Sequence, residues 1–363
     1  MGGSIPCPFF QLLAECTKMW LPGISAFIPM LTLIFSCIAA PDNVRAATEI
    51  RVTVAPPPDS LIYEAVKVFK DEAERLSAGN LHVEIYHSAK LYKTNETPQA
   101  VQSGAVEAGA AWLSLYMDAI PAASIFSLPF MFSRQKMAAA AAAPENGIRG
   151  PIDEAIPLAR NVRVLFWAPF PAVTFASKGF AISSPETIAG RKIRVFGALL
   201  PEFVKICGGT PVPLTGTDVP AAFRDGRIEA TITALDVFTS LKLWEVADHV
   251  NVARPIHDEW VLVMNGRFWD GLDPDAQRIL KEAAQAAEKS AREGVSQWEE
   301  NTVKLIASHG VDVTQINDDD IMAWKSCSSE IAEGYLARSD RLGMKVLAAY
   351  RKLLISLYSA APN

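Results

Sequence analysis

The segment 190–235 constrains the fold of this chain more than any other part of the sequence, because it alternates strand-like and helix-like patterns. It opens on a short strand in which Ile193 and Val195 share one face, while Lys192 and Arg194 lie on the other. A helix, a second strand, a second helix and a third strand follow. Strands joined by helices in this way pair in parallel through right-handed crossovers, so the segment predicts a parallel sheet.

Glycine residues and one aspartate mark the helix ends within this segment. Gly208 and Gly209 end the first helix, since glycine readily adopts the left-handed conformation found at helix C-termini. Asp218 is placed to cap the second helix and Gly226 to end it. Parallel sheets bind ligands beyond the C-terminal ends of their strands, and Arg194 lies at such an end. Arg194 is therefore the first candidate for contact with a ligand, with a solvated arginine as the alternative.

The N-terminal part of the chain repeats the same alternation of strands and helices. Strands are predicted at 49–54, 81–85 and 108–113, and helices between them at 62–76 and 97–103. This order predicts a second parallel sheet of the same kind as the first. Two such sheets in one chain indicate two lobes that face a cleft, where ligands bind.

The remaining patterns connect the two lobes. Residues 134–160 are predicted to form two helices, and the segment Pro169-Phe170-Pro171 is the predicted first crossing from one lobe to the other. Strands are predicted at 249–252 and 259–264, with the chain returning to the first lobe between them.

One long helix is predicted from Asp273-Pro274, a favourable helix start, to about His309. About 37 residues would span roughly 55 Å, which exceeds the size of one lobe, so this helix should bridge both. The tail from Asp318 to Tyr358 is predicted to form two helices that cover the second lobe.

Together these patterns predict an α/β protein with two lobes, each built on a mostly parallel sheet flanked by helices, and a long helix that spans both. The predicted organisation is an export signal at 1–46, the first part of lobe I at 47–169, the first part of lobe II at 170–254, a return to lobe I with the spine helix at 255–295, and a lobe II cover with C-terminal helices at 296–363.

Residues 1–46 have the pattern of a secretory signal. Lys18 precedes the uncharged, mostly apolar run 19–40, and Val44-Arg45-Ala46 offers small residues where signal peptidases cut. We therefore expect a cleaved signal peptide, a periplasmic location and a mature chain that begins near residue 47.

Three alternatives to this processing stay open. The apolar run is about 20 residues long, which is enough for a membrane anchor, although Pro22 and Pro29 interrupt it. Cys37 would allow attachment of a lipid. Translation from Met19 would account for the long lead before the first lysine.

Composition excludes some classes of function. The formal net charge is −6, which makes binding to nucleic acid unfavourable. Of the five cysteines, only Cys207 and Cys327 lie beyond the signal. Both are in helical patterns, where free buried thiols are expected, and a disulfide between them is the alternative in an oxidising compartment. The sequence contains no CxxC or HxxxH spacing, so neither a metal site nor another cofactor is expected.

A family resemblance is carried by the motifs AGRKIRV, GGTPVP and AAFRDGRIEA, and by the long match that begins at VKVFKDEAERLSAGN and the apolar turn SIFSLPFMF. They resemble the P-type, dicarboxylate-binding-like solute-binding proteins of tripartite ATP-independent periplasmic (TRAP) transporters. The resemblance implies a two-lobe periplasmic binding protein fold, a monomer, no enzymatic activity, and membrane permease subunits as partners. It also implies that Arg194 clamps the carboxylate of a small-molecule ligand.

The resemblance extends to further candidate ligand-binding residues. Glu96 stands at the family's glutamate, and Trp112 follows a strand that presents ligand-facing residues; a helix N-terminal carboxylate and core packing are the alternatives. Thr233 occupies the position of a family asparagine. The set is completed by Phe170 in the first crossing, Phe196 after the Arg194 strand, and Trp260 near the second crossing, for which hinge packing is the alternative.

The sequence also departs from the family. Many members carry a further arginine near 168–171, where this chain has Ala168-Pro169-Phe170-Pro171. Ile232 replaces an acidic residue of the family. These departures favour an acid smaller or less polar than a sialic acid or a C4-dicarboxylate. An exported sensor that reports a solute to a signalling partner stays an alternative function. A periplasmic enzyme is disfavoured, because no nucleophile motif is present and His257-Asp258-Glu259 is expected to be a solvated turn.

Overall fold

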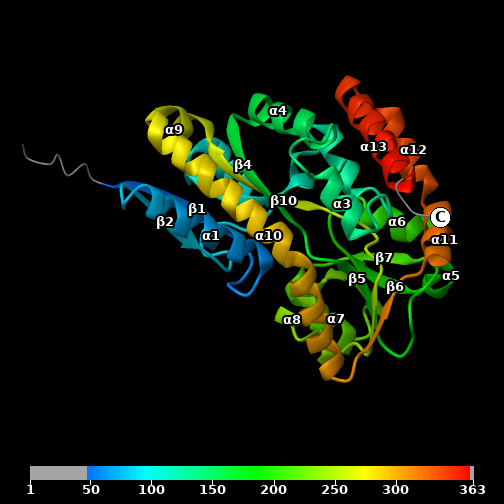
Figure 1. The fold of residues 1–363 in the computed structure, drawn as a ribbon. Coiled ribbons are helices and arrows are strands. Elements are labelled where there is room, and N and C mark those ends of the chain that lie inside the picture. The colour runs from blue at the N-terminus through cyan, green and yellow to red at the C-terminus, as the bar shows by residue number, and fades with distance from the viewer. Residues whose placement is uncertain (1–46, 360–363) are drawn as a thin grey trace, which may run out of the picture. The chain divides into compact units, whose positions relative to one another are not determined.

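The computed structural model describes residues 47–359, so the predicted export signal lies outside the described residues. Residues 47–359 form two β-sheets flanked by helices (Figure 1). Within this range, no helix is both long enough and apolar enough to cross a membrane.

The first sheet has the strand order β2-β1-β3-β10-β4. β1 pairs in parallel with β2 and with β3, and the helices α1 and α2 connect them, which confirms the predicted alternation. The Ser60 hydroxyl caps α1 by accepting a hydrogen bond from the Tyr63 N–H at 3.4 Å. The elements are β1 (Thr48–Thr53), α1 (Leu61–Leu76), β2 (Leu81–Tyr86), α2 (Thr97–Ser103), β3 (Ala108–Trp112), β4 (Val162–Pro169) and β10 (Glu259–Asn265).

The second sheet has the strand order β11-β9-β5-β8-β6-β7. β6 pairs in parallel with β7 and β8 across the helices α6 and α7, as the segment 190–235 predicts. The four-residue strand β11 was not predicted; unlike the equally short β6 and β9, it is mostly exposed and offers no buried apolar face to mark it. The elements are β5 (Val173–Ser177), β6 (Lys192–Val195), α6 (Leu200–Ile206), β7 (Thr210–Pro213), α7 (Val219–Arg224), β8 (Ala230–Ala234), β9 (His249–Val252) and β11 (Asp312–Gln315).

Shorter elements join these strands. The two helices predicted within 134–160 are present as α3 and α4. The connecting elements are η1 (Leu113–Tyr116), η2 (Pro121–Ser127), α3 (Gln135–Ala141), α4 (Arg149–Arg160), α5 (Pro185–Ile188), η3 (Gly216–Asp218), α8 (Leu235–Ser240), η4 (Leu243–Glu245) and α9 (Gly266–Gly271).

Both sheets also contain antiparallel pairs, formed by the strands that follow a crossing. β5 enters the second sheet directly after β4 leaves the first, and it runs antiparallel to β8 and β9. β10 enters the first sheet after β9 and runs antiparallel to β3 and β4. A strand that starts where its neighbours end must run opposite to them. The crossings therefore lie at the C-terminal ends of β3, β4 and β8, the ends at which such sheets bind ligands.

The long helix α10 (Pro274–Ser308) contains 35 residues and begins at Asp273, whose side chain accepts the Ala276 N–H. At about 1.5 Å per residue it is roughly 50 Å long. It packs against α1 and β4 of the first sheet and reaches α8 and β11 of the second (Figure 1). The predicted bridging helix is therefore present, and it continues without a break through Gly294.

The C-terminal tail forms three helices rather than the predicted two: α11 (Asp318–Cys327), α12 (Ser329–Arg338) and α13 (Arg341–Ser359). α11 and α12 are separated at Ser328, whose hydroxyl donates to the Trp324 carbonyl at the end of α11. α11 contacts α5 beside the second sheet, whereas α13 packs against α3, α4 and η2. The tail therefore contacts the second sheet's helix α5 and also the elements that connect β3 to β4 of the first sheet. The apolar residues of its last helix make the second set of contacts.

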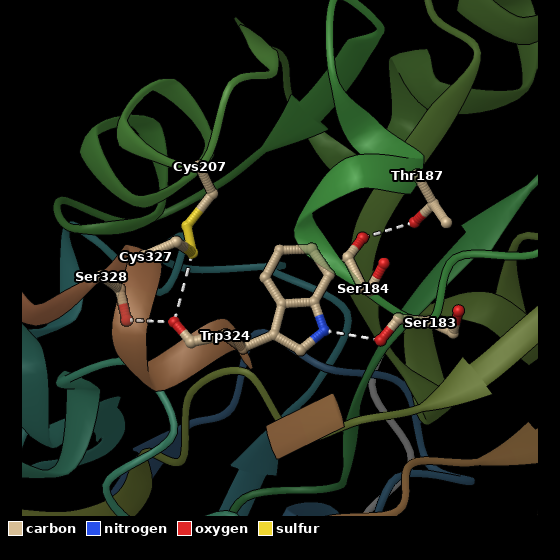
Figure 2. Close-up of a disulfide and its surroundings, with 7 residues drawn as sticks. All are labelled: Ser183, Ser184, Thr187, Cys207, Trp324, Cys327 and Ser328. Carbon is tan, nitrogen blue, oxygen red and sulfur yellow. Dashed lines mark hydrogen bonds between the residues drawn. A yellow bond between two sulfur atoms is a disulfide. The ribbon is translucent and has the colours of Figure 1, made fainter. Parts of the chain in front are cut away.

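Cys207 and Cys327 form a disulfide, so the expectation of free thiols was wrong (Figure 2). The bond joins the end of α6 to the end of α11, with the two Cα atoms 5.3 Å apart, although 120 residues separate them in the chain. Beside it, the buried Trp324 donates its indole N–H to the Ser183 carbonyl at 2.9 Å. Helical periodicity could not reveal this pairing, because it depends on how distant segments pack.

Three segments pass between the sheets: the crossing from β4 to β5, the crossing from β9 to β10, and α10. Glu299 of α10 fastens the second-sheet ends of both crossings. Its carboxylate accepts the Ala172 N–H at 2.8 Å and a guanidinium N–H of Arg254 at 3.1 Å, and a second Arg254 nitrogen binds its other oxygen. Arg254 in turn donates its backbone N–H to the Val173 carbonyl.

A second ionic cluster, built on Glu288 and Arg292, lies seven to eleven residues earlier on α10 and holds the first-sheet ends of the crossings. Glu288 accepts the Trp167 N–H of β4 at 3.3 Å and also binds Arg149 and Arg292. Arg292 reaches the fully buried Glu259 of β10 at 3.2 Å. Burial opposes the charge of Glu288, but the hydrogen bond from Arg149 and the nearby cations hold its pKa below the ordinary value.

Candidate functional site

Arg194 projects from β6 into the centre of the molecule, where its side chain is 5% exposed. Two backbone carbonyls hold the guanidinium: Nε donates to Leu214 at 3.0 Å, and Nη1 donates to Ile232 at 3.0 Å. Leu214 directly follows β7 and Ile232 lies within β8, the two strands that pair with β6 on either side. The local sheet therefore fixes the plane of the guanidinium.

No carboxylate of residues 47–359 pairs with this buried cation. The buried Arg149 and the partly buried Arg254 and Arg292 each contact a glutamate. Burial lowers the pKa of Arg194 to about 10, and no neighbouring anion opposes that change. The group is still charged at neutral pH, so its charge is uncompensated by the part of the chain that the structure describes.

The free donors of Arg194 lie at the far end of the guanidinium. Nη2 donates no hydrogen bond to any described residue, and Gly216 lies beside it: a Cβ built there would be 4.0 Å from Nη2. With Nε already bonded, the Nη1–Nη2 edge is the one that a carboxylate can approach with two parallel hydrogen bonds.

Four aromatic side chains, which we call the aromatic cluster, are joined by ring contacts that reach Arg194 through Phe196: Trp112, Phe170, Phe196 and Trp260. The Arg194 Cζ is 5.3 Å from the Phe196 ring centre, and the Phe196 ring is 6.0 Å from that of Trp112. Trp112 lies 6.0 Å from Trp260 and 5.9 Å from Phe170, and Trp260 stacks on Phe170 at 5.9 Å. Trp112 and Trp260 belong to strands of the first sheet, and Phe196 follows β6 of the second. Phe170 lies in the crossing from β4 to β5, so the cluster includes residues from both sheets.

The structure therefore brings together five of the seven candidates predicted from the sequence. Thr233 lies on the same side of the second sheet, because Thr231, two residues earlier on β8, pairs with Arg194. Thr233 is 1% exposed and its hydroxyl has no partner among the described residues. The indole nitrogens of Trp112 and Trp260 are likewise buried, and neither finds an acceptor within residues 47–359.

Glu96, by contrast, makes no hydrogen bond or ring contact with Arg194 or the aromatic cluster within the described residues. Its side chain is exposed, and its carboxylate accepts the Lys93 N–H at 2.9 Å in the turn that precedes α2. This arrangement matches the alternative of a carboxylate at a helix N-terminus.

A cavity of about 80 Å³ adjoins the aromatic cluster. Trp112 and Phe196 form part of its wall, together with Ser114, Ser127, Leu200 and Asp258. Arg194 does not line this cavity, so the cavity and the uncompensated cation are neighbours that share Phe196 and Trp112 rather than one continuous space.

The expectation that His257-Asp258-Glu259 forms a solvated turn was wrong, since these side chains are 3%, 4% and 0% exposed. Asp258 accepts hydrogen bonds from the Ser114 N–H and hydroxyl and from the Glu259 N–H, which ties the second crossing to η1. Burial raises the pKa of the Asp258 carboxyl to about 6. Its local sequence is polar, and only the packing of β10 within the first sheet buries it.

Known proteins resemble this chain in sequence and in fold. The C4-dicarboxylate-binding periplasmic protein DctP of Rhodobacter capsulatus is 24% identical over 300 residues, which cover 81% of this chain and 87% of that protein. The crystal structure of DctP7, an extracytoplasmic solute receptor of Bordetella pertussis that binds pyroglutamic acid, matches with a TM-score of 0.77 at 19% identity. The match covers 84% of this chain and 100% of DctP7.

A TRAP periplasmic solute-binding protein of Sulfitobacter, solved with bound β-D-galacturonate, matches with a TM-score of 0.75 at 22% identity, covering 84% of this chain and 100% of that one. These structural matches show the two-lobe fold. The family model described as bacterial extracellular solute-binding protein, family 7 (DctP), matches residues 52–339. The chain therefore belongs to the family of bacterial extracellular solute-binding proteins, family 7.

Proposed function

We propose that this chain is the extracytoplasmic solute-binding subunit of a TRAP transporter, that it captures an organic acid through Arg194, and that it delivers the acid to membrane permease subunits. The observation that carries the proposal is the buried, uncompensated guanidinium of Arg194. No anion of residues 47–359 pairs with this cation, and a ligand carboxylate would supply one.

The geometry of the guanidinium supports a carboxylate in particular. Two backbone carbonyls fix its plane, and the Nη1–Nη2 edge presents parallel N–H donors that match the two oxygens of a carboxylate. The relatives named above bind a C4-dicarboxylate, pyroglutamic acid and β-D-galacturonate, each of which carries a carboxylate.

The arrangement of the two sheets supports capture by closure. Arg194 belongs to the second sheet, whereas Trp112 and Trp260 belong to the first, so a ligand between them would contact both lobes. Binding would then favour the closed form, and the permease would meet a surface that exists only when the lobes are closed. No reaction step is needed for this function, in keeping with a binding protein rather than an enzyme.

Substitution of Arg194 tests the proposal. A thermal-shift screen of organic acids identifies a ligand, since a ligand at 100 times its dissociation constant adds about 2.7 kcal/mol of stability. Calorimetry with that ligand should show a loss of roughly 30- to 4000-fold in affinity for Arg194→Lys, because removing one member of a buried charge pair costs about 2–5 kcal/mol and an ammonium cannot reproduce the fork.

Arg191→Lys is the matched control. Arg191 directly precedes β6, the strand that carries Arg194, but it is half-exposed and pairs with Glu229. Its affinity should stay within about threefold of the wild type, as expected for an exposed ion pair. Wild-type affinity in Arg194→Lys would remove Arg194 from the site and refute the proposal.

A further inference from the structure

Three polar groups without partners lie in the aromatic cluster or on β8, the strand next to Arg194, and restrict the chemistry of a ligand there. The indole N–H groups of Trp112 and Trp260 and the hydroxyl of Thr233 are buried, and none has a hydrogen-bond partner in the described part of the chain. Trp260 is 2% exposed and Thr233 is 1% exposed. Buried polar groups are nearly always paired, so a ligand that enters here would be favoured if it supplied the partner that residues 47–359 do not.

Most of these groups can only donate. An indole N–H and a guanidinium donate hydrogen bonds and accept none, whereas a hydroxyl does both. The one carboxyl that lines the adjoining cavity, Asp258, already accepts three hydrogen bonds from Ser114 and Glu259. The partner that fits this set of groups is therefore an acceptor rather than an amine.

The two indoles occupy directly opposed positions in the first sheet. Trp112 of β3 and Trp260 of β10 are register partners in an antiparallel pair, and their rings lie 6.0 Å apart. Arg194 approaches the same cluster from the second sheet through Phe196. A ligand whose carboxylate binds Arg194 would thus present its other end to indole donors of the opposite lobe.

We propose that the ligand is a small monocarboxylate that carries a second, uncharged acceptor oxygen, of which a carbonyl is the simplest kind, and that the indole of Trp112 or Trp260 donates to it. This inference rests on the proposed function of Arg194. A second carboxylate is disfavoured because Arg194 is the cation that contacts the cluster, and the cluster's rings would bury another negative charge without compensation.

Pairs of acids that differ only in the carbonyl oxygen provide the test. We would titrate the exported form of the protein with 2-oxopentanoate and pentanoate, and with 4-methyl-2-oxopentanoate and 4-methylpentanoate, by calorimetry. In the wild type, the oxo acid of a pair should bind roughly tenfold more tightly, because its partner leaves a buried donor unpaired.

Trp112→Phe and Trp260→Phe keep an aromatic ring and remove the donor. At least one of them should bring the affinity ratio of a pair close to one, by weakening the oxo acid alone. Trp244→Phe is the control: Trp244 packs against Phe238 and His309, and its loss should leave the ratio unchanged. Thermal melting of each variant identifies any that does not fold, and either of the two tryptophans then suffices.

The outcomes separate this inference from the proposed function. If the members of each pair bind equally and Arg194→Lys abolishes both, the acceptor oxygen is wrong and the carboxylate clamp stands. A ratio that survives in both Trp→Phe variants also overturns the inference. A wild type that binds none of these four acids but binds another acid from the organic-acid screen through Arg194 overturns this inference and leaves the proposed function standing.

Discussion

Arg194 differs in its partners from three other buried or partly buried arginines of the described chain. Arg149, Arg254 and Arg292 are matched by glutamates and hold the structure together, whereas Arg194 is held by backbone carbonyls alone. Removing a structural arginine would leave a glutamate buried and unpaired, which lowers stability. Arg194→Lys should therefore affect binding far more than folding, in contrast to a substitution of Arg149.

Asp258 gives a prediction of pH dependence at the same scale. Burial raises its pKa to about 6, above the ordinary value of 3.8, so the folded state binds the proton more tightly than the unfolded state. The stability contributed by protonation is present below about pH 4 and is lost as the pH rises to 6. The loss is at most about 3 kcal/mol.

Asp258→Asn removes this titration while preserving an oxygen for the backbone donors and an amide for the Ser114 hydroxyl. Urea unfolding at pH 4.5 and pH 7 should show the variant gaining stability relative to the wild type as the pH rises. Other titrating groups, such as Asp236, are common to both proteins and cancel in the difference. A difference that does not change with pH would contradict a raised pKa.

At the scale of elements, the disulfide between α6 and α11 is the feature that the helical pattern could not show. It closes a long loop of the chain, and loops of this size lose much of their unfolded-state entropy when cross-linked. The bond also holds α11 where Trp324 packs against Phe130, Phe175 and Phe203. The disulfide therefore supports the attachment of the C-terminal tail.

Replacing both cysteines, as Cys207→Ser with Cys327→Ser, should lower the free energy of unfolding by about 2–5 kcal/mol. Thermal melting with and without a reductant measures the effect. The reductant should lower the melting temperature of the wild type toward that of the double variant and leave the variant itself unchanged. Equal melting temperatures in all conditions would show that the bond does not form in solution.

At the scale of the whole molecule, the two ionic clusters on α10 define where the lobes can bend. Glu288 and Arg292 fix the first-sheet ends of the crossings, and Glu299 fixes the second-sheet ends. Between these points the chain has Pro169 and Pro171 in one crossing, Pro255 in the other, and Gly294 in the helix. We expect closure to rotate the lobes about these three short segments while each cluster stays intact.

Spin labels test this expectation. The distance between labels at Leu158→Cys on α4 and Leu305→Cys on the last turns of α10 should change when a ligand is added, because the bend lies between them. The control pair, Leu305→Cys with Arg227→Cys, joins two exposed positions beside the second sheet and should keep its distance. Equal changes in both pairs would place the motion elsewhere.

Local periodicity was sufficient to predict the strands and helices of both parallel units, the bridging helix and the crossing at Pro169–Pro171, because each depends on neighbouring residues. It also pointed to Arg194 as a candidate, since the strand end that carries it is a local feature. Phe170, Phe196, Trp112 and Trp260 could be named singly, but their assembly into one cluster depends on the pairing of β3 with β10 and on the meeting of the two sheets.

The amino-acid sequence by itself determined most of the elements up to the end of α10, their order and the family's motifs, because hydrophobic period and turn residues act over a few positions. Only the tertiary structure decided the disulfide, the burial of Asp258, the pairing of β11 and the missing partner of Arg194. Each of these depends on which distant groups come within a few ångströms of one another, and that is settled by packing rather than by local pattern.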